Sequence, residues 1–306
     1  MKVFFLKVGV VAIFLLFVVT LIVPNLSSAA DSGIQISPLT YNLEVSPGES
    51  EDISIKVTNL NDEDLSYVIE IENFNNVSDE GAPSFSNQDT DADITSLKDW
   101  IVVNPTSDKE GIIKPRESKD ISFSINIPKG AEAGGHYAAV FAKEVKKTDE
   151  GKTQIGVSSR VGTLVLVSIP GNVVKSAEIS EFNPKKIVWA GPVDLSMKVR
   201  NTGTVHYDSQ GTVEIKSLIG NTSEVDMGTH TIIPKNERLY TGGWSQKYPF
   251  GRYILAAKAV DGNGDIVSTS RIVWAIPLII VIPVLVGLII LIWVIMYFKR
   301  HVRIIK

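Results

Sequence analysis

The 306-residue sequence contains no cysteine and only four histidines. Without cysteine there is no disulfide bond, no thiol catalysis, no thiolate zinc site and no lipidated cysteine. Three of the histidines, His136, His206 and His230, are far apart in sequence and lack a metal-ligand spacing. The sequence also lacks a nucleophile elbow, a phosphate-binding loop and a glutamate flanked by paired histidines. These absences predict that the protein is not an enzyme and uses no metal or cofactor.

Positive charge is scarce between residues 31 and 271. The whole chain has 30 Lys and Arg against 34 Asp and Glu, but six of the basic residues lie at the two ends. The middle region therefore has 24 basic and 34 acidic residues, a net charge of −10. So acidic a region repels phosphate backbones and anionic lipid. We expect no nucleic-acid partner and no peripheral attachment to an acidic bilayer.

The N-terminal 30 residues have the organisation of a secretory signal peptide. Lys2 and Lys7 precede an uncharged apolar run, Val8–Val23, and small residues occupy Ser28 and Ala30. A basic head, an apolar centre and small residues predict cleavage before Asp31. Because the apolar run is slightly long for a signal, an uncleaved membrane anchor is the alternative.

The other end of the chain predicts a transmembrane helix. Ile272–Phe298 contains no charged residue, and a helix of that length spans about 40 Å, enough to cross a bilayer with tilt. The basic tail, residues 299–306, predicts a cytoplasmic C-terminus and places residues 31–271 outside the plasma membrane. Aromatic residues lie near the ends of the span, as interfacial aromatics do: Trp274, Trp293, Tyr297 and Phe298.

The exported region predicts an all-β fold. Short segments alternate apolar and polar residues, as in Ile53–Asn59, Tyr67–Ile71 and Ile121–Ile127. Turn sequences rich in Gly, Pro, Asn and Asp separate them, among them Asp261–Asp265, expected to join two strands. No helical periodicity is present to cover a parallel sheet, so antiparallel β-sandwiches are expected.

A weak internal repeat predicts two sandwiches in tandem. Ile55–Asn59 is echoed by Met197–Asn201, an alternating strand that ends at Asn before a turn. Gly135–Phe141 is echoed by Gly251–Ala257 at a similar separation. The repeat therefore indicates two immunoglobulin-like domains with equivalent strands.

Pro170–Asn172 marks the expected domain boundary. It places the first immunoglobulin-like domain at residues 31–172 and the second at 173–271. No flexible linker is visible there, so the domains are expected to pack as a semi-rigid rod. Tyr137 and Tyr253 match the tyrosine that bridges a corner in such folds, and a structural role is expected for both.

One long polar segment, Asn75–Leu97, differs from the strands around it. It is acidic, and alternating aspartates of this kind can chelate calcium. Ile94 and Trp100 occupy the positions where an EF-hand loop needs Gly and Glu, so a solvated acidic loop is expected, with calcium as the alternative. The alternating acids are Asp89, Asp91 and Asp93.

The candidate binding residues lie at a strand end and in this loop. Gly134, Gly135 and His136 begin an apolar strand, and we expect them to form an exposed rim with Asp89, Asp91 and Asp93. The acidic charge favours a ligand with amines or neutral sugars. The alternative site is the aromatic cluster Tyr240–Phe250, whereas Trp100 and Trp189 are expected in the cores.

Six segments of the first domain carry a family resemblance: Gly33–Pro38, Leu43–Ser50, Ile55–Asn59, Ile127–Lys129, Gly134–Phe141 and Val161–Val167. In these segments the chain resembles the N-terminal domain of WxL-interacting proteins, which are bacterial surface proteins. The resemblance covers about residues 33–182 and implies a surface scaffold whose first domain binds peptidoglycan and whose second binds a partner protein or host component.

A second resemblance is to periplasmic pilus chaperones. Gln154–Val161 is similar to the strand that donates apolar side chains to a pilin subunit. The family's two cleft cations are missing, because one position falls at Gly162 and Ile34–Val45 holds no Arg or Lys. An unpaired edge along Ile155–Val167 would favour a chaperone, and a paired strand a scaffold.

We therefore expect a membrane-anchored bacterial cell-surface binding or scaffold protein. Its expected partner is the cell wall, through peptidoglycan, or a surface protein. The alternative is an exported accessory factor that acts on other surface proteins by strand addition, and an exported enzyme comes third.

Overall fold

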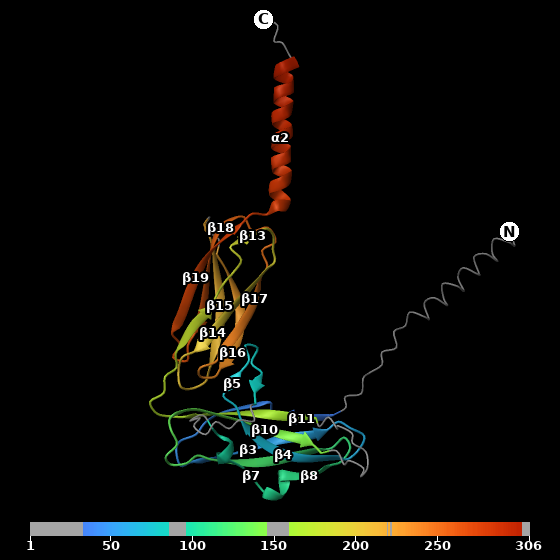
Figure 1. Cartoon of the computed structure of the whole chain (residues 1–306), viewed down its shortest axis with the longest axis vertical. Helices are drawn as coiled ribbons and strands as arrows, with labels where there is room; N and C mark the ends of the chain where they lie inside the picture. The colour runs from blue at the N-terminus through green and yellow to red at the C-terminus, as the bar shows by residue number, and fades with distance from the viewer. Residues whose placement is uncertain (1–32, 86–95, 146–158, 219, 221, 302–306) are drawn as a thin grey trace, which may run out of the picture. The chain divides into compact units, whose positions relative to one another are not determined.

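The computed structural model describes residues 33–85, 96–145, 159–218, 220 and 222–301. The expected signal peptide, residues 1–30, lies outside the described residues. Within them the regular structure is mostly β-strand, followed by one α-helix, α2 (Figure 1). The all-β expectation is confirmed.

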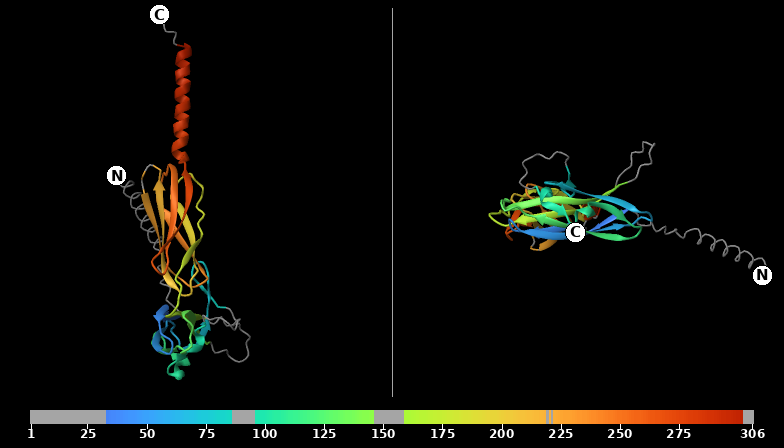
Figure 2. Two further views of the ribbon diagram at one scale, coloured as in Figure 1. Left: turned by 90° about the vertical axis from the view of Figure 1, so that its left-hand side faces the viewer. Right: turned by 90° about the horizontal axis from the view of Figure 1, so that it is seen from below.

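The first sandwich has two sheets, seen from further directions in Figure 2. One sheet has the order β1 (Ile34–Ser37), β3 (Ser50–Asn59), β9 (Ser118–Asn126) and β7 (Ile101–Val103). The other has the order β2 (Thr40–Glu44), β11 (Arg160–Ile169), β10 (Gly134–Glu144), β4 (Leu65–Asn73) and β8 (Glu110–Ile113). The short strands β5 (Asn76–Val77) and β6 (Pro83–Ser84) form a separate hairpin, and two 3₁₀ helices, η1 (Lys98–Trp100) and η2 (Thr106–Lys109), flank β7.

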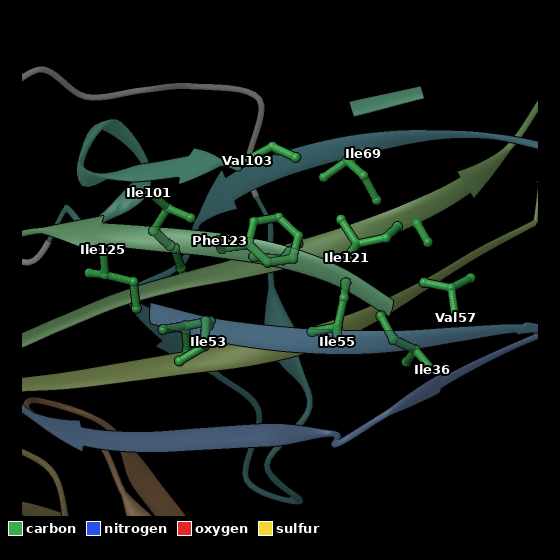
Figure 3. Packing of buried hydrophobic residues seen from close by; sticks show 14 of the residues in the cluster. Ile36, Ile53, Ile55, Val57, Ile69, Ile101, Val103, Ile121, Phe123 and Ile125 are labelled. Carbon is green, nitrogen blue, oxygen red and sulfur yellow. The ribbon is translucent and has the colours of Figure 1, made fainter. Parts of the chain in front are cut away.

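The core of the first sandwich follows the alternation of its strands. Ile55 and Ile121 face each other across β3 and β9, and both are fully buried. Phe123 packs beside them between the sheets (Figure 3). Burying each such side chain contributes about 2 kcal/mol, so this layer drives the folding of the domain.

The second sandwich repeats the two-layer plan. Its smaller sheet has the order β12 (Ala177–Glu181), β14 (Val193–Asn201) and β17 (Glu237–Trp244). Its larger sheet has the order β13 (Ile187–Val188), β19 (Ile266–Ala275), β18 (Gly251–Val260), β15 (Tyr207–Ser217) and β16 (Thr222–Ile232). The chain thus contains two tandem immunoglobulin-like β-sandwiches, as the sequence predicts.

The internal repeat is visible in two buried asparagines. Asn59 ends β3, and its Nδ2 donates to the backbone oxygens of Glu63 and Ile113 at 2.8 and 3.0 Å. Asn201 ends β14, and its Nδ2 donates to the backbone oxygens of Val205 and Ile232 at 2.9 and 2.8 Å. Each side chain closes the turn that follows its strand, so the two positions are equivalent in structure as well as in sequence.

The described part of the expected acidic loop is a hairpin that contacts the second sandwich. Val77 donates its backbone N–H to Oδ1 of Asn236 at 2.8 Å, and Leu239 donates to the backbone oxygen of Asp79 at 2.8 Å. The carboxylate of Asp79 pairs with Lys198 at 2.6 Å. The expectation of one solvated loop was therefore wrong for β5 and β6, because Asn236, Leu239 and Lys198 of the second sandwich bind this hairpin.

The helix α2, Leu278–His301, begins later than the expected Ile272. Residues 272–275 are instead the end of β19, where they pair with Gly251–Ile254 of β18. Within the described residues Leu278–Arg300 is the one helix long and apolar enough to cross a membrane, and none of its most apolar window is buried. Twenty-three residues span about 35 Å, which exceeds the hydrocarbon thickness of a bilayer.

Candidate functional site

A groove runs along the open side of the first sandwich, between β4 and β7. It has a volume of about 880 Å³. β10 pairs with Ile69–Glu72 on one side, but β8 pairs with β4 only over Leu65–Val68, so the other side of Ile69–Glu72 has no neighbour among the described strands. Among the described strands β7 pairs with β9 alone. Two strand edges without a strand partner in this part of the chain therefore border the same groove.

Two ion pairs lie along the β4 wall of the groove. Glu70 contacts Nζ of Lys143 at 2.8 Å, and Glu72 contacts the guanidinium of Arg160 at 2.6 Å. The guanidinium of Arg160 also lies over the ring of Phe141, 4.2 Å from its centroid. All four charged side chains keep roughly a third of their surface exposed, so a ligand can reach both signs of charge.

The opposite wall of the groove is apolar with a polar end. Val102 of β7 is half exposed, and Ile101 and Val103 on either side of it point into the core. Thr106 and Lys109 of η2 line the end of the groove. Open backbone edges, an apolar wall and charges of both signs suit an extended ligand that carries amines and carboxylates.

The expected rim residues lie at the junction of the two sandwiches. Gly134 and Gly135 are buried, and the backbone N–H of Gly135 donates to the backbone oxygen of Thr204 in the second sandwich at 2.9 Å. Gly134 has φ of 137°, and a Cβ there would lie 2.9 Å from the same oxygen. The hydroxyl of Tyr137 accepts a hydrogen bond from the backbone N–H of His206 at 3.1 Å. These contacts occupy the strand end that we expected to be exposed.

His136 is buried, with 3% of its surface exposed, so the expectation of an exposed side chain was wrong. Its Nδ1 lies 3.2 Å from the backbone oxygen of Ser96, and its Nε2 lies 3.1 Å from that of Glu132. The ring packs on Trp100, with centroids 4.7 Å apart. Both ring nitrogens are engaged by the protein, which gives His136 a structural role; a binding role for the rim stays a prediction. Asp89, Asp91 and Asp93 lie outside the described residues.

Tyr137 does not bridge a corner within its own domain. Its hydroxyl reaches His206 of the other sandwich, whereas the hydroxyl of Tyr253 accepts a bond from the nearby backbone N–H of Phe250 at 3.2 Å. Both tyrosines are structural, as expected, but only Tyr137 connects the two sandwiches.

A smaller cavity of about 310 Å³ lies at the same junction. Apolar side chains from both sandwiches line it, including Phe74, Leu166 and Ile233, together with His230 and Arg238. Burial and the nearby Arg238 cation lower the pKa of His230, which favours its neutral form. Nε of Arg238 is buried and has no hydrogen-bond partner among the described residues, so the polar side of this cavity favours an acceptor or an anion.

The pairing of β11 distinguishes a scaffold from a strand-donating chaperone over the described part of the expected strand; its first residues, Ile155–Ser158, lie outside the described residues. Leu164–Ser168 pair with β10 on one side and, in parallel, with Thr40–Glu44 of β2 on the other. Oγ1 of Thr163 donates to the backbone oxygen of Pro38 at 2.7 Å and holds the start of β2 in place. A strand with neighbours on both sides cannot donate itself to a partner, so Leu164–Ser168 favour the scaffold interpretation.

Some of the tryptophans and some residues of the aromatic cluster Tyr240–Phe250 differ from expectation in whether they are buried or exposed. Trp189 is 49% exposed rather than in a core, while Trp100 packs against the first core. Tyr240 and Trp244 are buried in the second core, so they cannot form an exposed platform. Exposed aromatic surface in this segment comes from Tyr248 and Phe250.

Sequence reasoning missed the groove residues. Glu70 and Glu72 alternate with apolar residues along β4, a pattern that shows two outward carboxylates on one face. Their partners Lys143 and Arg160 come from β10 and β11, and only the register of the sheet brings the four together.

Part of the first sandwich matches a known protein family. Residues 31–144 match the family model described as WxL Interacting Protein, peptidoglycan binding domain, which confirms the resemblance noted from the sequence over these residues. No curated protein matches the chain significantly.

Solved structures similar to this chain include pilus chaperones. The class 5 fimbriae chaperone CfaA is 16% identical with a TM-score of 0.39, over 79% of this chain and 99% of that one. The E. coli chaperone DraB is 14% identical with a TM-score of 0.37, over 78% and 96%. A protein of unknown function from Porphyromonas gingivalis W83 is 10% identical with a TM-score of 0.30, over 79% and 99%.

Proposed function

We propose that this chain, whose residues 31–144 match the peptidoglycan-binding domain of WxL-interacting proteins, is a single-pass membrane protein that binds peptidoglycan at the cell surface. The observation that carries the proposal is the family match over the sandwich that holds the open groove. The helix α2 anchors the chain, and the basic tail keeps the C-terminus in the cytoplasm.

The groove suits the peptide part of peptidoglycan. Those short peptides carry amines and carboxylates. Their amines can pair with Glu70 and Glu72, and their carboxylates with Lys143 and Arg160, in place of the ion pairs within the protein. The backbone edge at Ile69–Glu72 can pair with an extended peptide while Val102 contacts its apolar side chains.

The test is sedimentation of the full-length chain, in detergent micelles, with purified peptidoglycan sacculi. Two groove variants, Glu70→Gln/Glu72→Gln and Lys143→Gln/Arg160→Gln, are expected to raise the apparent Kd about tenfold or more, because each loses charge-assisted contacts. The matched control is Glu178→Gln/Glu181→Gln, which removes two ion-paired carboxylates from the second sandwich and is expected to bind like the parent.

The experiment tests peptidoglycan binding and the location of the binding site separately. A parent chain that does not sediment with sacculi contradicts peptidoglycan binding. A parent that sediments, with groove variants that sediment equally well, moves the site to the junction residues or to Tyr248 and Phe250.

A surface protein that supplies an extended strand is the second candidate ligand, because the β4 edge is open to strand addition. Hydrogen exchange of the full chain distinguishes the two. A protein strand is expected to protect the amides of Ile69–Glu72 strongly, whereas sacculi from which the peptides have been removed should leave them unchanged.

A further inference from the structure

The end of the second sandwich that leads into α2 carries a group of exposed apolar side chains, which we call the basal collar. Four of its members are aromatic, and the most exposed of these are Phe250 at 62% and Trp274 at 52%. The basal collar consists of Ile187, Trp189, Leu218, Tyr248, Phe250 and Trp274.

Strand pairing brings these side chains to one end of the sandwich. Ile187 of β13 and Arg252 of β18 both pair with Trp274 of β19, and Leu218 donates its backbone N–H to the oxygen of Arg252 at 3.1 Å. Phe250 directly precedes Gly251, the partner of Ala275. The collar is therefore one surface assembled from four segments of the chain.

This surface is tied closely to the start of α2. Only two residues separate the end of β19 at Ala275 from Leu278. The first of them, Ile276, donates its backbone N–H to the backbone oxygen of Val188 at 2.8 Å. The oxygen of Pro277 then accepts the first bonds of the helix, from Ile280 at 2.9 Å and Val281 at 3.0 Å. Figure 1 shows β13 and β18 at the end of the sandwich from which α2 leaves. So short a connection holds the collar within the headgroup depth of any bilayer that α2 crosses.

The charge around the collar is opposite to that of the whole exported region. Lys185, Lys186, Lys247 and Arg252 lie within or beside its segments. No Asp or Glu occurs in residues 182–193, 241–260 or 266–277. Nζ of Lys247 also lies 5.4 Å from the ring centroid of Tyr248, so a cation and an aromatic ring are presented together.

We propose that the basal collar is a lipid-binding surface that seats the second sandwich on the outer face of the membrane, with its aromatic rings among the headgroups and its cations on lipid phosphates. Tyr and Trp favour this depth because one end of each ring system is apolar and the other forms hydrogen bonds. Lys and Arg near the membrane surface are attracted to anionic lipid. The proposal rests on the membrane anchoring proposed above and is independent of peptidoglycan binding.

The natural absence of cysteine makes a direct test simple. Single cysteines at Phe250, Trp189 and Tyr248 are spin-labelled in the full-length chain, reconstituted in vesicles of phosphatidylcholine with 30% phosphatidylglycerol. All three positions are exposed, so the substitutions leave the core intact. The matched control is Ile266→Cys, which is 65% exposed at the opposite end of β19, and the membrane reference is Leu288→Cys within α2.

We expect the collar labels to collide more with oxygen than with a water-soluble nickel chelate, as lipid-inserted groups do, and the label at residue 266 to show the reverse. Replacing phosphatidylglycerol by phosphatidylcholine should reduce the insertion at residue 250 at least twofold. The quadruple variant Lys185→Gln/Lys186→Gln/Lys247→Gln/Arg252→Gln should remove this lipid dependence.

Three labelling results would contradict either the lipid-binding collar or the membrane anchor. Collar labels as water-accessible as residue 266, with residue 288 in lipid, overturn the proposal and leave the anchor standing. A water-accessible label at residue 288 contradicts the anchor itself. Collar labels that are immobilised but inaccessible to both oxygen and the chelate would show that protein covers the collar, which also overturns the proposal.

Discussion

The hydroxyl of Tyr137 in the first sandwich lies 3.2 Å from Nδ1 of His206 in the second, and it also accepts the backbone N–H of His206. Nε2 of His206 lies 2.7 Å from Oδ1 of Asn42. Because an amide oxygen only accepts, Nε2 carries the proton, and Nδ1 accepts from the Tyr137 hydroxyl. One neutral imidazole thus connects β10 and β2 of the first sandwich to the second.

The first prediction tests this connection by removing one oxygen atom. Tyr137→Phe leaves the backbone N–H and Nδ1 of His206 without their buried partner, so we expect the free energy of unfolding to fall by about 1–3 kcal/mol. The matched control is Tyr253→Phe, whose hydroxyl accepts a single bond at an exposed backbone N–H, with an expected cost below about 1 kcal/mol. Urea unfolding of the detergent-solubilised chain measures both. Equal losses of unfolding free energy in the two variants would contradict a stabilising role for the hydrogen bonds between Tyr137 and His206.

The second prediction concerns pH. Burial, assisted by Lys175, lowers the pKa of His206 from its ordinary value of 6.5 to about 4. Between these two values the unfolded state binds a proton that the folded state does not, so stability is complete above pH 6.5 and falls as the pH is lowered toward 4. The loss amounts to about 3 kcal/mol at most.

His206→Gln serves as the comparison because its amide does not titrate. The stability difference between the parent and this variant should shrink as the pH falls from 7 to 4. A difference that stays constant over this range would contradict a neutral buried His206.

Alternation of apolar and polar residues was enough to predict the two sandwiches, because each strand has one buried face and local sequence determines which. It also located Asn59 and Asn201 as equivalent strand ends. It failed at His136, whose burial depends on the carbonyl oxygens of Ser96 and Glu132, and at the glycines that approach Thr204 of the other sandwich. The contacts with Ser96 and Thr204 arise from segments distant in sequence, so a single strand pattern contains no signal for them.

The third prediction uses the repeated asparagines. Asn59→Ala removes the hydrogen bonds to the backbone oxygens of Glu63 and Ile113, and Asn201→Ala removes those to Val205 and Ile232, so each should cost at least about 2 kcal/mol. Asn126→Ala is the control, since that exposed side chain only accepts a bond from Ser50 and should cost less than about 1 kcal/mol. Similar losses of unfolding free energy at all three positions would show that Asn59 and Asn201 stabilise the fold no more than an exposed asparagine does.

The fourth prediction concerns orientation in the membrane. The tail after α2 is basic, and positively charged flanks remain in the cytoplasm, so both sandwiches should face outward. A single cysteine at the exposed Ile266 should react with a membrane-impermeant maleimide on spheroplasts, whereas a cysteine added after Lys306 should react only after lysis. The parent chain has no cysteine and supplies the background for both. Labelling of the tail on intact spheroplasts, with protection of residue 266, would reverse the orientation; the first sandwich could then not meet peptidoglycan, and the proposed function would fail with it.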